Sequence, residues 1–116
     1  MDGVKTMAGA QTPDPWCTPV EPGVLMAGTN VVNTSAVAVA AMNYDPRARK
    51  GAVPFERSDN KLLLAEQLGV GSADLSRIEV IGPSIKEVMF DFRALREKRR
   101  AERPNRPYGG RGTIQN

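Results

Sequence analysis

Few side chains in this chain could do chemistry, and their types and spacing favour no common reaction. The 116 residues include no histidine and one cysteine, Cys17. Without an imidazole, the usual general base for a serine or cysteine nucleophile is missing. One thiolate cannot complete a zinc or iron–sulfur site. Glu87 and Asp91 lie one helical turn apart and could do acid–base work in a pocket, but this composition favours two solvated carboxylates.

Phosphate-binding loops are also missing from the sequence. Gly69-Val70-Gly71 has no third glycine at the spacing of a dinucleotide-binding turn, and it follows a predicted helix instead of a strand. No Walker-type loop occurs. We therefore expect a protein that is not an enzyme and that holds no cofactor, no metal and no small-molecule substrate.

The composition limits the core that must position any site. Nine prolines and eleven glycines accompany only six aromatic residues, and alanine and valine inflate the 41% hydrophobic fraction. Alanine buries little area, and transfer free energy scales with area at about 25 cal/mol per Å². We expect weak autonomous stability and a mostly irregular, extended chain with a few short α-helices.

The clearest predicted element is an amphipathic helix over about 85–103. Ser84 and Glu87 have the spacing of a capping box, and Pro104 ends the helix. An apolar stripe follows the cap at helical spacing and then gives way to basic residues. The stripe predicts a hydrophobic anchor for a partner, made of Ile85, Val88, Met89, Phe92 and Leu95.

Three further segments carry weaker patterns. A helix is predicted over about 59–69, begun by Ser58 or Asp59 and closed by Gly69 in the left-handed conformation. Residues 36–43 alternate alanine and valine, which is compatible with a strand, but Ser35 could cap a short helix there and the alanine content favours the helix. Alternation over 77–81 predicts a short strand, which would need a partner chain or residues 31–41 to pair with.

These elements divide the chain into three regions. Residues 1–57 form a Pro/Gly-rich extended arm with the short Ala/Val segment, 58–103 a small helical anchor region, and 104–116 a basic Gly/Pro tail. Trp16 lies between prolines in the arm. It either anchors a partner, as tryptophan often does at interfaces, or folds back over the chain's own helices.

Charge is distributed unevenly along the chain. Residues 1–92 carry eight Lys/Arg and eleven Asp/Glu, whereas residues 93–116 carry eight Lys/Arg and two Glu. A basic end suits RNA, an acidic protein surface or an anionic membrane, although a charge run can also be a solvated tail. The residues predicted to meet an acidic surface or nucleic acid are Arg96, Lys98, Arg99, Arg100, Arg103, Arg106 and Arg111.

Together these features predict a non-catalytic structural or accessory subunit. It would dock onto a large assembly, such as a virion or a cytoskeletal lattice, through its arm and its C-terminal helix, and its partners would be protein subunits. The alternatives are a ribosomal or other ribonucleoprotein subunit that binds RNA, and a small adaptor that folds on binding one regulatory partner. No apolar run is long enough to span a membrane, and no signal or transit peptide is recognisable. We expect an intracellular protein, soluble or particle-associated.

Overall fold

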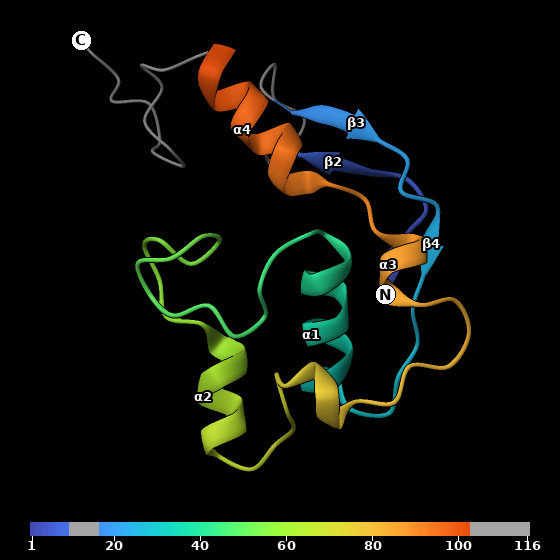
Figure 1. The fold of residues 1–116 in the computed structure, drawn as a ribbon, viewed down its shortest axis with the longest axis vertical. Coiled ribbons are helices and arrows are strands. Elements are labelled where there is room, and N and C mark those ends of the chain that lie inside the picture. Colours follow the sequence, from blue (N-terminus) through green and yellow to red (C-terminus); the bar gives the residue numbers. More distant parts are fainter. Residues whose placement is uncertain (10–16, 103–116) are drawn as a thin grey trace, which may run out of the picture.

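A computed structural model describes residues 1–9 and 17–102. A helical part surrounds helix α1 (Val31–Ala41), and a narrow β ribbon extends beside it, with helix α4 (Phe92–Glu102) lying against the ribbon (Figure 1). The prediction of a mostly irregular chain with a few short helices is confirmed.

The N-terminal segment forms a ribbon by pairing with itself. Strands β1 (Asp2–Gly3) and β4 (Val24–Leu25) pair antiparallel, as do β2 (Thr6–Ala8) and β3 (Thr18–Val20). Pro19 of β3 cannot donate a ladder hydrogen bond, which a two-stranded ribbon tolerates because each strand has one open edge. The part of the predicted arm that forms these strands is therefore paired within the chain, and Trp16 lies outside the described residues.

The Ala/Val segment forms helix α1 (Val31–Ala41), which resolves the choice between helix and strand over 36–43. The helix begins earlier than Ser35, because Asn30 accepts hydrogen bonds from the N–H groups of Val32 and Asn33. It ends at Ala41, Met42 is the C-cap, and the following Asn43 is left-handed with φ 63°. Tyr44 and Asn43 donate to the carbonyls of Val39 and Ala40, which is the Schellman arrangement.

Helix α2 (Lys61–Gln67) lies inside the predicted 59–69 segment, and Gly69 closes it with φ 74° as expected. The predicted caps Ser58 and Asp59 are wrong, because Asn60 caps the helix through Leu62 N–H. A short 3-10 helix, η1 (Leu75–Arg77), follows. The strand predicted over 77–81 is wrong: residue 77 ends η1, residues 78–81 are irregular, and the segment 31–41 that could have paired with it is helical.

The predicted 85–103 helix is broken into α3 (Ile85–Val88) and α4 (Phe92–Glu102). The capping box of Ser84 and Glu87 is confirmed at the start of α3. Met89 then turns extended, with ψ 126°. Phe90 N–H bonds to Ala41 O at the end of α1, and Asp91 caps α4 through Ala94 N–H. The apolar stripe predicted one continuous helix. Its backbone hydrogen bonds at this point are replaced by the Asp91 cap and by the contact with α1.

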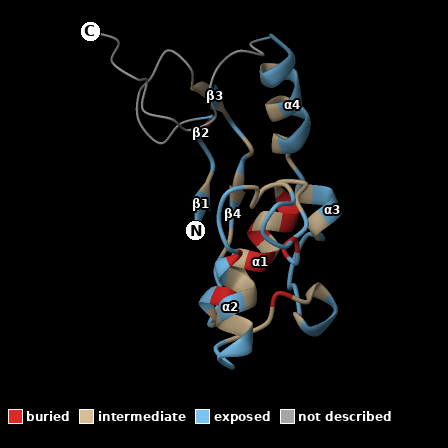
Figure 2. Cartoon of the chain, turned by 90° about the vertical axis from the view of Figure 1, so that its left-hand side faces the viewer, coloured by how far each residue is buried: buried red, intermediate tan, exposed pale blue. Residues whose placement is uncertain are grey.

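The core of the described chain is small and consists almost entirely of alanine. Its buried residues cluster on α1 and the segments around it (Figure 2), and no large side chain is fully buried. The buried apolar residues are Ala8, Val32, Ala36, Ala38, Ala40, Ala41, Ala48 and Ala73. Alanine lets the backbones approach closely but removes little apolar area from water.

Candidate docking surface

The predicted hydrophobic anchor is largely used within the chain. Helix α3 contacts α1, and α4 contacts strand β2. Four of the five stripe residues are half-buried, and only Met89 is exposed, at 40%. The half-buried members are Ile85, Val88, Phe92 and Leu95. A partner would therefore have to displace contacts that the stripe already makes.

Two of the predicted partner-binding arginines continue this inward face. Arg96 and Arg99 follow Phe92 at i+4 and i+7, so they lie on the same side of α4. Arg96 Nη2 lies 2.5 Å from Glu56 Oε1, and its side chain is only 13% exposed. Arg99 Nη1 donates to the carbonyl of Ala8 on β2. Both guanidinium groups thus attach α4 to distant parts of the chain.

Glu56 is the counter-charge for this attachment. Partial burial opposes its ionisation, but the hydrogen bond from Arg96, a backbone hydrogen bond and the charges of Arg96 and Arg100 outweigh that effect. The pKa of Glu56 is therefore lowered from the usual value. Arg100 Nη1 also lies 3.8 Å from Glu56 Oε1, so the carboxylate faces two guanidinium groups.

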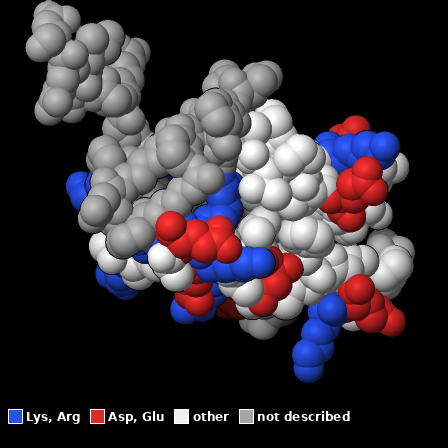
Figure 3. All heavy atoms as spheres, turned by 90° about the horizontal axis from the view of Figure 1, so that it is seen from above, with Lys and Arg blue, Asp and Glu red and all other residues white. Residues whose placement is uncertain are grey.

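The outer face of α4 carries charges of both signs. Arg93 Nε lies 3.5 Å from Glu97 Oε1, and Lys98 and Glu102 are exposed. Seen from above, basic and acidic side chains are interleaved on the visible surface (Figure 3). The described part of α4 thus presents no uniform basic face. Arg103, Arg106 and Arg111 lie outside the described residues.

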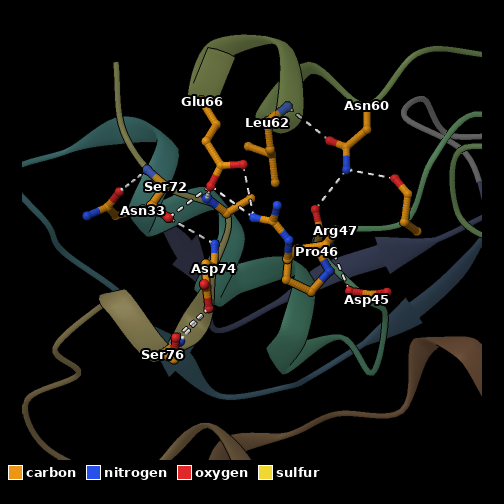
Figure 4. A network of polar contacts seen from close by, with 12 residues as sticks. Asn33, Asp45, Pro46, Arg47, Asn60, Leu62, Glu66, Ser72, Asp74 and Ser76 are labelled. Carbon is orange, nitrogen blue, oxygen red and sulfur yellow. Dashed lines mark hydrogen bonds and ion pairs between the residues drawn. The ribbon is translucent and has the colours of Figure 1, made fainter. Parts of the chain in front are cut away.

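A polar network joins α2 to the neighbouring segments (Figure 4). Arg47 Nη1 lies 2.9 and 3.0 Å from the two carboxylate oxygens of Glu66. Glu66 also accepts from Ser72 Oγ at 3.0 Å and from Ala73 N–H at 3.2 Å. The hydrogen bond from Arg47, aided by that from Ser72, lowers the pKa of Glu66 against a smaller opposing effect of burial.

The carboxylates that could do chemistry are engaged in similar structural contacts. Glu87 belongs to the capping box, and the hydrogen bond from Ser84 N–H lowers its pKa. Asp91 caps α4 and accepts from Asn43 Nδ2 at 3.0 Å. The Ala94 N–H is the main cause of its lowered pKa. Among residues 1–9 and 17–102, no group of three or more acidic or cysteine side chains is arranged to hold a metal ion.

A more exposed apolar surface lies where α1 begins and α2 ends. We name it the α1–α2 patch: Val31, Leu64, Leu68 and Val70, with exposed fractions of 72, 47, 81 and 49%. Asn30 Nδ2 donates to Val70 O at 2.7 Å, which brings the chain after α2 against the start of α1. The start of α1 and the end of α2 both lie in the lower part of Figure 1.

Gly71 makes this close approach feasible. A Cβ at this position would lie 2.7 Å from Val32 Cβ and 2.9 Å from Asn33 Oδ1. Asn33 Oδ1 also accepts from Ser72 N–H at 2.8 Å. The backbone of residues 70–72 is thereby held against α1, which gives the α1–α2 patch a defined shape.

Sequence reasoning missed this patch, although one signal for it was present. Leu62, Leu63, Leu64 and Leu68 cover more than one side of a short helix. Leu62 and Leu63 are half-buried, whereas Leu64 and Leu68 share the exposed face at i, i+4. Leucines on both faces of one helix indicate a second, outward-facing contact surface.

No helix in the described part of the chain is long and apolar enough to cross a membrane. Comparison of the chain with protein-family models, with curated proteins and with solved structures finds no match.

Proposed function

We propose that this protein is a non-catalytic accessory subunit that docks onto a larger protein assembly through the α1–α2 patch. One observation carries the proposal: the buried core is nearly all alanine, while large apolar side chains such as Leu68 and Val31 face solvent. A small core gives little stability by itself, so covering these side chains would add the missing apolar burial. The assembly would lie inside a cell or in a particle assembled there.

The surroundings of the patch support binding to protein. The exposed side chains that form it are aliphatic and uncharged, and aliphatic contact is typical of the dry centre of a protein interface. Two of the predicted basic contacts are less available, because Arg96 and Arg99 are engaged by Glu56 and Ala8. Protein subunits are therefore preferred over RNA as the partner.

The carboxylates support a non-catalytic role. Glu56 and Glu66 are paired with arginines, and Glu87 and Asp91 cap helices. A general acid or base needs a proton-transfer position beside a bound substrate. Each of these groups is instead engaged in a contact that holds a helix end or joins two segments of the chain.

The test replaces Leu68 with Glu in the full-length chain. A charge at the centre of the patch should reduce association with the native assembly at least 10-fold, because a buried unpaired carboxylate is costly. Since Leu68 is 81% exposed, the circular dichroism of the free chain should not change. Ile81→Glu is the matched control: Ile81 is 89% exposed but lies outside the patch, so its variant should associate normally.

Association is measured by co-sedimentation with the assembly, with and without nuclease and across a salt series. Equal association of Leu68→Glu and the original chain would contradict the proposal. Loss of association on nuclease treatment, with a steep fall in affinity as salt rises, would instead support the ribonucleoprotein alternative.

A further inference from the structure

The break between α3 and α4 interrupts a sequence that is suited to one continuous helix. No proline or glycine occurs between Ser84 and Glu102. The apolar positions keep helical spacing across the break, from Ile85 and Val88 to Phe92 and Leu95. We call residues 89–91 the hinge. Their types do not require a break, because methionine, phenylalanine and aspartate all occur within helices at modest cost.

A few polar contacts hold the hinge in its bent form. Phe90 N–H donates to Ala41 O at 2.9 Å, Asp91 caps α4, and Asn43 Nδ2 donates to Asp91 Oδ1 at 3.0 Å. The rings of Phe90 and Phe92 add a tilted contact with centroids 4.9 Å apart. A straight helix would lose these contacts and gain i→i−4 backbone hydrogen bonds through the hinge. The bent and the straight forms are therefore close in free energy.

Arg96 and Arg99 attach α4 to segments far away in the sequence. Arg96 bonds to Glu56, 40 residues away, and Arg99 bonds to Ala8, 91 residues away. Neither contact requires that α4 belong to the same chain. Glu56 and Ala8 of a second copy would offer the same counter-charge and the same carbonyl.

We propose that α4 exchanges between two copies of this chain. In the exchanged form the hinge is helical, so α3 and α4 are continuous and α4 is carried away from its own β2. The inward face of α4 (Phe92, Leu95, Arg96 and Arg99) then occupies the equivalent site on the second copy, and the second copy's α4 fills the vacated one. Such an exchange makes a closed, symmetric dimer with nearly the contacts of the monomer.

A charge-reversal pair tests the exchange directly. Glu56→Arg alone opposes Arg96 with a like charge, and Arg96→Glu alone opposes Glu56. Each variant should therefore run as a 12.6 kDa monomer, because its own α4 and that of an identical copy are both repelled. An equimolar mixture should form a heterodimer of twice that mass, since opposite charges meet only when the two chains exchange α4.

The double variant Glu56→Arg/Arg96→Glu is the matched control. It restores an opposite-charge pair within one chain, so it should behave like the original chain in size-exclusion chromatography with light scattering. A mixture of the two single variants that stays monomeric up to millimolar concentration, while the double variant folds, would overturn the proposal.

The hinge supplies an independent test. Glycine at position 89 is compatible with the bent hinge, because it tolerates the backbone angles of Met89 and keeps the backbone N–H that ends α3. Met89→Gly disfavours a continuous helix, so it should lower the dimer fraction several-fold. Asp91→Ala removes the cap of α4 and its bond to Asn43, and should raise the dimer fraction. A higher dimer fraction in the Met89 variant than in Asp91→Ala would also overturn the proposal.

Discussion

Asn30 and Asn60 each form hydrogen bonds through both the oxygen and the nitrogen of the side-chain amide. The oxygen of each caps a helix, and the nitrogen donates to a distant carbonyl. Asn60 Nδ2 reaches Pro46 O at 2.7 Å and Ala48 O at 2.9 Å, and the residue is only 3% exposed. Serine or aspartate would cap as well but could not donate to two carbonyls. Asparagine at these positions therefore both caps a helix and makes a tertiary hydrogen bond.

Replacing Asn60 with Asp separates the two roles. The cap acceptor remains, but both donated bonds are lost and a carboxylate faces two carbonyl oxygens. We expect a loss of about 2–4 kcal/mol, because the buried carbonyls lose their donors and the charge is poorly solvated. The urea midpoint of unfolding measures this loss. Asn30→Asp, which loses one bond at a less buried site, should cost less; an equal or reversed order would contradict the assignment.

At the scale of elements, the docking of α4 relies on its own arginines beyond the point where the apolar stripe ends. Arg96 and Arg99 are half-buried on the inward face, and long basic side chains commonly cover apolar surface with their aliphatic parts. Their charged ends then reach Glu56 and the Ala8 carbonyl. Gly9 accommodates Arg99, since a Cβ there would overlap its guanidinium group. The docking of α4 thus depends on charge as much as on apolar contact.

Acid should therefore weaken the docking of α4. The pKa of Glu56 is lowered in the folded chain, so its contribution to stability is present above its unfolded pKa of about 4.5 and is lost as pH falls through the folded value. Amide exchange of residues 92–102 should accelerate, relative to that of α1, as pH falls below about 4.5. Intrinsic exchange rates at each pH are used for normalisation.

Glu56→Gln is the variant that tests this assignment. Its α4 amides should be less protected at neutral pH and should lose less of their protection in acid. Glu66, Glu87 and Asp91 have lowered pKa values as well, so part of the acid sensitivity of the chain should remain. Glu102→Gln, at an exposed position on the same helix, should behave like the original chain. An unchanged pH profile in Glu56→Gln would rule out its role.

At the scale of the whole molecule, polar contacts compensate for a small core. Alanines around α1 bring backbones together, and Asn60, Arg47 and Glu66 connect α2 to the loop before it. Such contacts specify an arrangement but add modest net free energy, since each replaces hydrogen bonds to water. The described fold is therefore well specified and weakly stabilised.

The isolated chain should accordingly unfold over a broad temperature range. Amides of α1 should exchange most slowly, and those of residues 79–82 should exchange almost freely. Ala36 is fully buried in the middle of α1, and Ala36→Gly should lower stability by about 1–2 kcal/mol through helix propensity and the lost methyl group. Differential scanning calorimetry and hydrogen exchange measure both effects. One sharp transition with most amides protected would contradict this account.

Several local features were predictable because neighbouring residues decide them. The Ser84–Glu87 capping box and the left-handed Gly69 depend on backbone groups within one helical turn, and both are present. The small core was implied by the composition. Contacts between distant residues were not predictable: Asn60 outcompetes Ser58 and Asp59 as a cap because Pro46 and Ala48 hold its amide nitrogen.

Sequence alone determined that this chain has short helices, few large buried side chains and a C-terminal segment with an apolar stripe and a basic end. Only the tertiary structure decided which faces remain open. The break at residues 89–91 turns α4 back onto β2, so Arg96 and Arg99 contact their own chain while Leu68 and Val31 face solvent. Periodicity reports that a helix has an apolar face, but only the path of the chain determines what that face contacts.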